Sequence, residues 1–136
     1  IARHRRPCPL IAEGRILAAG GVSAMLDCSD GLALDVARLA DASRCHATID
    51  LDRVPLQDGV AVVADALGRT PDTFAASGGE DYELIAAVPA DRLPAIQEQL
   101  SRPATVVGHL TAGSGPDLVR SGADVALASW GWLHDV

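Results

Sequence analysis

Segments with a helical spacing of apolar residues alternate along this chain with segments typical of β-strands, and this alternation restricts the folds open to it. Helical spacing is found at residues 10–19, 32–42, 60–67 and 93–100, and strand patterns at residues 22–26, 46–52, 82–88 and 105–110. A closing hairpin is expected where residues 118–120 and 125–127 flank Ser121-Gly122. We therefore predict an α/β fold, an α-β-α sandwich whose sheet is mixed because hairpin-linked strands close it.

The helix expected at residues 32–42 separates its side chains onto different faces. Leu32, Val36 and Leu39 recur at the 3.6-residue period and indicate a face that packs on the core. Asp35 and Arg38 are expected on another face. The spacing therefore predicts an amphipathic helix with its charges turned away from the apolar residues.

Composition and charge exclude several classes of function. The chain has 136 residues, enough for one domain, and 49% of them are hydrophobic. Its net charge of −7 disfavours a nucleic-acid partner, because binding to phosphates requires a basic surface. Its apolar runs are too short to span a membrane and no signal peptide is recognised, so we expect a cytoplasmic protein without a membrane partner.

The beginning of the chain and its cysteines point to a reduced, intracellular fragment. Residues 1–9 are basic and interrupted by prolines, which is typical of a linker, so we expect the folded domain at residues 10–136 of a longer protein. The cysteines at positions 8, 28 and 45 are scattered and odd in number, which favours free thiols and disfavours zinc. Cys28 is interpreted as a small apolar core residue.

The segment Asp27-Cys28-Ser29-Asp30-Gly31 stands where the strand at residues 22–26 ends and a helix begins. Ligands of α/β proteins bind at this end of a strand, and carboxylate and hydroxyl oxygens suit Mg²⁺ beside a phosphate chain. Alternatively, Ser29 or Asp30 caps the helix. A cap does not explain Asp27, because burying an acid at the end of an apolar strand is costly without a partner. From the residues alone, a magnesium site and a helix cap both stay open.

Two further segments have a functional and a structural interpretation. Ser77-Gly78-Gly79-Glu80-Asp81 precedes the strand at residues 82–88, so its acids stand either at a ligand site or in a tight, solvated turn. Trp130 and Trp132 either stack on a flat heterocycle or pack against the core. The chain has no Walker loop and no Ser-His-Asp set, which disfavours a P-loop kinase and a covalent hydrolase. No catalytic residue is predicted.

Together, the segments at residues 25–32 and 77–84 resemble the paired motifs of the thiamine-monophosphate kinase family, in the C-terminal half of those enzymes. Residues 5–9, 49–56 and 106–108 also fit the family pattern, so the resemblance covers nearly the whole chain. It implies the C-terminal domain fold of the AIR-synthase (PurM-like) superfamily. It also implies direct transfer of the γ-phosphate of ATP, the co-substrate, to thiamine monophosphate, assisted by Mg²⁺ ions.

Carried over position by position, the resemblance implies specific roles. Asp27 and Asp30 would bind metal, and Ser29 would contact ATP. Glu80 and Trp132 would contact the thiamine substrate. Direct phosphoryl transfer of this kind requires no nucleophile from the enzyme, since positioning and charge neutralisation carry it.

The resemblance also has departures and rivals. Leu133 and Asp135 stand where the family's terminal motif has Asp and Phe around its His. The family's N-terminal domain, with most of its ATP and magnesium acids and its dimer-forming sheet, is not in this chain. We therefore expect a homodimeric full-length protein and an inactive isolated fragment. The alternatives are another ATP-dependent enzyme of the superfamily, or a stand-alone ligand-binding module without catalysis.

Overall fold

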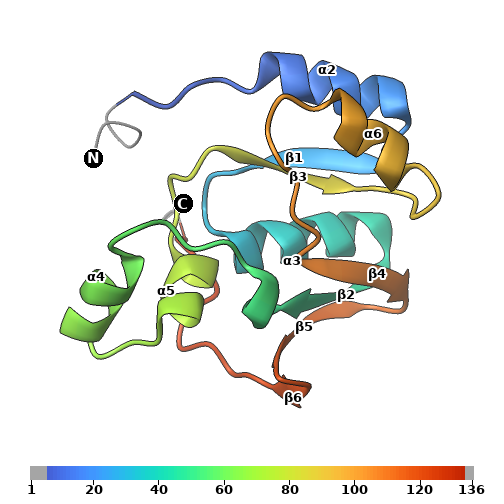
Figure 1. Ribbon diagram of the computed structural model, residues 1–136. Helices are drawn as coiled ribbons and strands as arrows, with labels where there is room; N and C mark the ends of the chain where they lie inside the picture. The colour runs from blue at the N-terminus through green and yellow to red at the C-terminus, as the bar shows by residue number, and fades with distance from the viewer. Residues whose placement is uncertain (1–5, 134–136) are drawn as a thin grey trace.

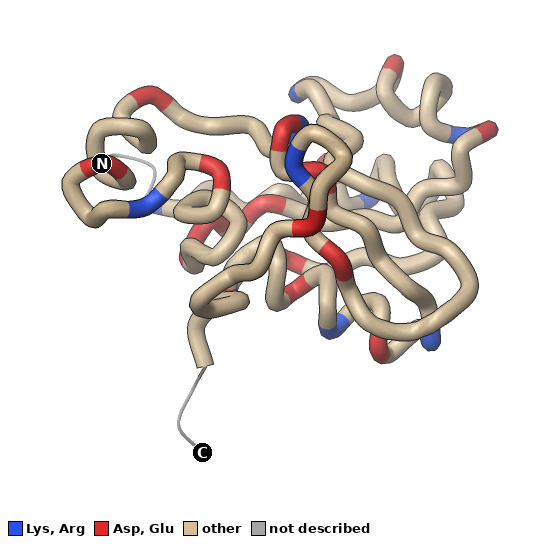
Figure 2. The backbone as a smooth tube through the Cα atoms, turned by 90° about the horizontal axis from the view of Figure 1, so that it is seen from below, with Lys and Arg blue, Asp and Glu red and all other residues tan. Residues whose placement is uncertain are grey.

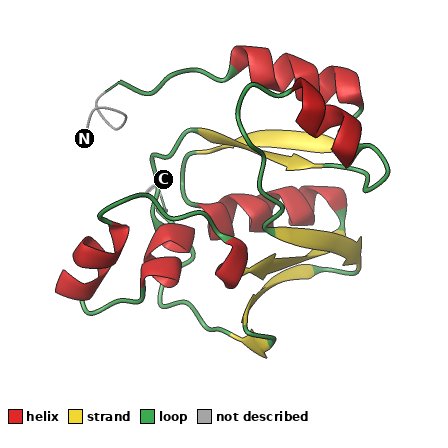
Figure 3. Cartoon of the chain, in the orientation of Figure 1, coloured by secondary structure: helices red, strands yellow, loops and turns green. Residues whose placement is uncertain are grey.

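The computed structural model describes residues 6–133 and stacks helices and sheets in successive layers (Figure 1). Helices α2 (Ile11–Gly20) and α6 (Leu93–Gln99) cover one side of a two-stranded sheet. Helix α3 (Leu32–Ser43) lies on the other side of that sheet and separates it from a four-stranded sheet. Helices α4 (Val60–Ala66) and α5 (Pro71–Ser77) lie together beside this stack (Figure 3).

The strands are divided between the two sheets. In the smaller sheet, β1 (Ala24–Cys28) and β3 (Glu83–Ala87) are antiparallel. The larger sheet has the order β4-β2-β5-β6, with β4 (Gly108–Ala112), β2 (Cys45–Asp50), β5 (Gly115–Arg120) and β6 (Ala123–Asp124). It is mixed, because β2 is parallel to β5 while its other pairs are antiparallel. The predicted α/β class with a mixed sheet is confirmed, as is the hairpin around Ser121-Gly122.

The core is centred on α3 and the strand β2. Ala47 and Ile49 of β2 are buried at alternate positions, and Leu51 continues the pattern in a short 3-10 helix (Leu51–Arg53). The core cluster joins these to residues of α3, α5 and β5: Ala33, Val36, Ala40, Ala76 and Leu118. The apolar face predicted for this helix therefore packs as expected. Asp35 was wrongly expected on a different face: it is only 1% exposed, because it lies one turn before the buried Leu39.

Other departures from the sequence-based expectations are local. Helix α5 was not predicted, although Pro71 at its first position is a favourable start signal. Strand β4 begins at Gly108 and not at residue 105, because its partner β2 ends at Asp50 and the chain continues there as a 3-10 helix. The apolar residues predicted at helical spacing do form helix α4, but most of them are exposed, and Ala64 is the one buried residue of this helix.

Residues 6–10, which precede α2, have no regular secondary structure. Residues 1–5 of the predicted linker lie outside the described residues. Acidic positions occur on many segments of the backbone and outnumber the basic ones, in keeping with the negative charge of the chain (Figure 2). Within residues 6–133, no helix combines the length and the apolar character that crossing a bilayer requires.

Gly108 permits the close pairing of β4 with β2, which generates the first prediction. A Cβ atom at this position would lie 2.0 Å from the carbonyl oxygen of Thr48. We expect Gly108→Ala to lower the free energy of unfolding by about 1–3 kcal/mol, the usual cost of overpacking. Urea denaturation followed by circular dichroism measures it. The matched control is Gly14→Ala in α2, where the nearest neighbouring atom would be 3.6 Å away.

The control should behave in the opposite way. An alanine inside a helix is more favourable than a glycine by roughly 0.5–1 kcal/mol, so Gly14→Ala should leave the stability unchanged or raise it slightly. Equal destabilisation by both substitutions would contradict the close approach of β4 to β2.

Candidate functional site

The corner at residues 27–31 contains the last two residues of β1, which extends beyond the predicted residues 22–26, and the tight turn into α3. Gly31 is the residue before the first helical position, and its φ of 123° and ψ of 142° are accessible to glycine and unfavourable for other residues. No side chain caps the helix at this position. The alternative in which Ser29 or Asp30 acts as the helix cap is therefore wrong.

A carboxylate from inside the helix organises the corner instead. Oδ2 of Asp35 accepts hydrogen bonds from the backbone amides of Ser29, Asp30 and Gly31, at 3.0, 2.9 and 3.2 Å. These amides precede the helical hydrogen-bond ladder and need partners from elsewhere. The sequence pattern did not identify Asp35 as a site residue. The signal was its position four residues before the core residue Leu39, which places both on one face of the helix.

Arg38 connects this buried acid to the surface of the corner. Its Nη1 donates to Oδ1 of Asp35 at 3.1 Å and also forms an ion pair with the carboxylate of Asp30. The hydrogen bond to Asp30 is the main reason why the pKa of Arg38 lies above its ordinary value. The Asp30 side chain is 13% exposed and that of Arg38 46% exposed, so the pair lies at the boundary with solvent.

Asp27 differs from the expectation built on its burial. It is exposed at the end of β1, so the argument that it needs a partner because it is buried was wrong. It lines a cavity of about 370 Å³ together with Pro9, Leu10, Ile11, Tyr82 and Leu84. An exposed carboxylate beside a largely apolar cavity is free of the desolvation cost of burial and can accept a cation or a donor group from outside.

The glycine-rich segment lies directly against the corner. The amide of Glu80 donates to the carbonyl oxygen of Ser29 at 2.8 Å, and that of Tyr82 to Cys28 at 2.8 Å. A Cβ atom at Gly79 would lie 2.8 Å from the Ser29 oxygen, so glycine allows the two backbones to approach this closely. Glu80 has a φ of 67° and is exposed, and the turn thus presents its side chain beside the corner.

The C-terminal segment also meets the corner, and its two tryptophans differ in burial. The backbone amide of Trp132 donates to the carbonyl oxygen of Asp30 at 2.8 Å, and a Cβ atom at Gly131 would lie 2.4 Å from the same oxygen. The side chain of Trp132 is 67% exposed. Trp130 instead packs against the core cluster. His134 lies outside the described residues.

The corner offers hard oxygen donors but no complete metal cage. In the described part of the chain, no group of three or more His, Cys, Asp and Glu side chains is placed to hold a metal ion. Mg²⁺ is usually held by one or two carboxylates together with phosphates and water, not by a cage built only from protein. Asp27, Asp30 and the Ser29 hydroxyl fit that partial role by their chemistry.

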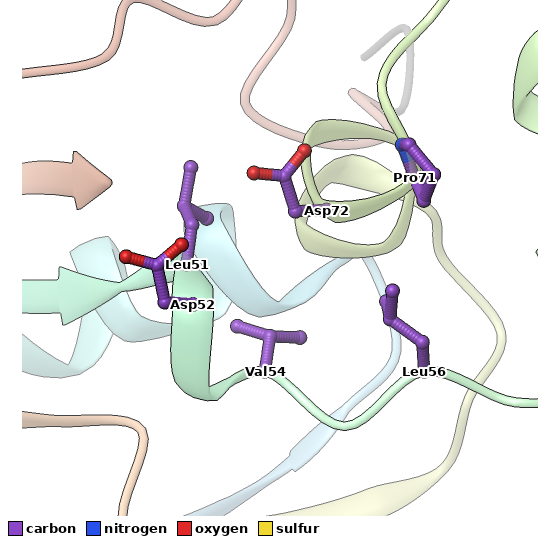
Figure 4. Close-up of a pocket in the computed structure, with 6 residues that line it drawn as sticks. All are labelled: Leu51, Asp52, Val54, Leu56, Pro71 and Asp72. Carbon is purple, nitrogen blue, oxygen red and sulfur yellow. The ribbon is translucent and has the colours of Figure 1, made fainter. Parts of the chain in front are cut away.

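A second cavity, of about 310 Å³, lies between the 3-10 helix and α5 (Figure 4) and is lined by Leu51, Asp52, Val54, Leu56, Pro71 and Asp72. Both acids are engaged in tertiary bonds. Asp72 accepts from Arg120 at 2.5 Å, and Asp52 accepts from the Ser121 amide at 2.6 Å. Burial alone would raise the pKa of Asp72, but its hydrogen bonds hold it below the ordinary value. These bonds tie the acids to the β5–β6 hairpin and explain them without a ligand.

Cys28 is confirmed as a core residue, and its environment makes it unreactive. The residue is 4% exposed. Burial, followed by the charges of nearby carboxylates, chiefly Asp81 and Asp35, raises the pKa of its thiol to about 12. Because the thiolate is the nucleophile, only a trace of Cys28 is reactive at pH 8.

We therefore expect iodoacetamide at pH 8 to modify Cys8 and Cys45 before Cys28, as followed by mass spectrometry of peptides. Cys8 is exposed and Cys45 is half-buried. In urea all three thiols should react at similar rates, since unfolding removes the burial. Equal rates in the native protein would contradict the burial and the raised pKa of Cys28.

Comparisons with known proteins show the family of the chain. The sequence pattern of the family described as AIR synthase related protein, C-terminal domain, matches residues 4–121. The thiamine-monophosphate kinase of Halobacterium salinarum is 43% identical over 127 residues, which cover 93% of this chain and 41% of that protein. The thiamine-monophosphate kinase of Salmonella typhimurium is 38% identical over 98% of this chain and 42% of its own length.

Solved structures extend the likeness to three dimensions. A structure described as AaThiL complexed with AMPPCP and TMP has a TM-score of 0.72 at 27% identity, covering 96% of this chain and 40% of that one. The E. coli hydrogenase maturation protein HypE, at 23% identity and a TM-score of 0.68 over 88% of this chain and 39% of its own, shares the fold. The chain thus spans about two-fifths of the length of the curated relatives it matches.

Proposed function

The chain belongs to the family of AIR synthase related proteins, as a C-terminal domain, and we propose that it supplies one part of the active site of a thiamine-monophosphate kinase. The kinase would transfer the γ-phosphate of ATP to thiamine monophosphate and form thiamine diphosphate. Support comes from the similarity to enzymes of that name and from the structure described with AMPPCP and TMP.

The observation that carries the proposal is the meeting of three distant segments at the end of β1. The Glu80 amide bonds to the Ser29 carbonyl, and the Trp132 amide bonds to the Asp30 carbonyl. The residues proposed for metal, nucleotide and substrate therefore lie on adjoining backbone.

Each residue has a role in this proposal. The carboxylates of Asp27 and Asp30 hold Mg²⁺, and the Ser29 hydroxyl binds a phosphate oxygen of ATP. Glu80 and Trp132 contact the thiamine substrate. Bound Mg²⁺ supplies neutralisation of the phosphate charge. Arg38 forms an ion pair with the Asp30 carboxylate and limits the orientations open to it.

The remaining three-fifths of the relatives' length would complete the site. Within residues 6–133 no three His, Cys, Asp or Glu side chains are placed together to hold a metal ion, so we propose that further acids come from a preceding domain, reached through residues 1–9. We also propose a homodimeric full-length protein in the cytoplasm. The exposed Asp27 beside the apolar cavity is compatible with a site that another domain closes.

The metal role of Asp30 is testable by titration calorimetry with Mg·ATP on the full-length protein that carries this chain. We expect Asp30→Asn to weaken binding of Mg·ATP by at least about tenfold, since substitution even of residues that only support the metal ligands lowers metal affinity by roughly 10–100-fold. Asp65→Asn, an exposed acid on α4, is the control for the loss of one charge. Unchanged affinity in Asp30→Asn would count against the metal role.

The activity itself separates the proposed function from its alternatives. In an assay for thiamine diphosphate, the full-length protein should convert thiamine monophosphate with ATP, while residues 1–136 alone should not do so at a useful rate, because part of the site is lacking. Robust activity of the 136-residue chain would refute the proposed division of the site. Turnover of a different substrate by the full-length protein would favour another enzyme of the superfamily, and ligand binding without turnover would favour a stand-alone module.

A further inference from the structure

We propose that Asp35 is a positioning residue of the phosphoryl-transfer site: it fixes the backbone of residues 29–31 and, through Arg38, the orientation of the Asp30 carboxylate. The role of the site in phosphoryl transfer rests on the proposed function. The positioning by Asp35 rests on its hydrogen bonds. Within residues 6–133, Asp35 is the one charged side chain that is fully buried, at 1% exposure. A buried carboxylate is costly unless its oxygens are satisfied, and the partners of Asp35 show what it is used for.

One oxygen of Asp35 holds the turn of the corner. Three consecutive amides, of Ser29, Asp30 and Gly31, donate to Oδ2 within 3.2 Å. Hydrogen bonds to a charged acceptor are stronger than those between neutral groups. A single oxygen that collects three neighbouring amides permits only a narrow range of backbone angles for these residues. The positions of the Ser29 hydroxyl and the Asp30 carboxylate follow from that backbone.

The other oxygen acts through Arg38. Oδ1 of Asp35 accepts from Nη1 of Arg38 at 3.1 Å, and the same nitrogen is paired with the Asp30 carboxylate. Asp35 therefore holds Asp30 in two ways. The Asp30 amide donates to Oδ2 of Asp35, and the Asp30 carboxylate pairs with the Arg38 guanidinium, which donates to Oδ1 of Asp35. Since both oxygens of Asp35 are occupied by these donors and the side chain is buried, Asp35 touches no ligand itself.

The same corner carries the two segments that bring in the proposed substrate contacts. The carbonyl oxygens of Ser29 and Asp30 accept from the amides of Glu80 and Trp132, while the amides of Ser29 and Asp30 donate to Asp35. Each residue is therefore bonded on both sides of its backbone. Loss of the Asp35 charge should loosen the metal ligand, the nucleotide contact and both substrate segments together, without removing any of them.

The test compares Asp35→Asn with Asp41→Asn in the full-length protein. Asp41 is on the same helix but is exposed, so its substitution removes one negative charge from α3 without removing a buried carboxylate. Amide hydrogen exchange without ligand reports the positioning, and titration with Mg·ATP reports the site. We expect Asp35→Asn to speed exchange at Ser29, Asp30 and Gly31 by at least about tenfold. We also expect it to weaken Mg·ATP binding by roughly 10–100-fold, as loss of an outer partner does.

Arg38→Gln separates positioning from folding and covers the case in which Asp35→Asn does not fold. It leaves the amide bonds to Asp35 in place but removes the link to Asp30. Mg·ATP binding should fall by roughly tenfold while exchange at residues 29–31 stays slow. Unchanged binding in Arg38→Gln, or unchanged exchange in a folded Asp35→Asn, would overturn the inference.

Failure of the proposed function is distinguishable from failure of the positioning. If the wild-type protein binds neither Mg·ATP nor thiamine monophosphate, the proposed function is wrong, and the role of Asp35 in the site falls with it, whatever the exchange data show. If the wild type binds both and Asp35→Asn binds them equally well, only the positioning is wrong. Faster exchange in Asp41→Asn as well would trace the effect to the helix and overturn the specific role of Asp35.

Discussion

The carboxylate of Asp35 holds the turn between β1 and α3, and the arrangement of the site depends on it. The amides of the turn that leads into α3 precede the helix, and buried amides need acceptors from elsewhere. Here the acceptor comes from the helix itself and serves Ser29, Asp30 and Gly31 at once. No side chain of the corner caps α3, and the Asp30 carboxylate pairs with Arg38.

Close contact between backbones is the second constraint, and glycine makes it possible. At Gly79 and Gly131 an added Cβ atom would lie within 2.8 Å of a carbonyl oxygen of the corner. These contacts bring the proposed substrate residues to the proposed metal ligands. They leave a site that is open on the side of Asp27 and the cavity beside Tyr82. An open, acidic site is compatible with the proposal that another domain completes it, since the chain spans about two-fifths of its relatives' length.

Much of the fold was predictable because its signals are local. Gly21, in the left-handed conformation, ends α2 where the Gly-Gly pair predicted an end, and alternate residues of β2 are buried as expected. Helix α5 was missed because its apolar residues Phe74, Ala75 and Ala76 are consecutive and show no helical spacing. The division of the strands into two sheets was not predictable, because strand pairing depends on contacts distant in sequence.

By itself, the sequence determined the α/β class, the family resemblance and the kinds of side chain near the end of β1, since these depend on composition, periodicity and motif spacing. Only the tertiary structure decided which acids are buried. Asp27 is exposed near the end of β1, where it lines a cavity, whereas Asp35 is buried because sheets lie on both sides of α3. A helical period places residues on a face, but only the neighbours packed against that face determine whether a charge on it meets water or a set of backbone amides.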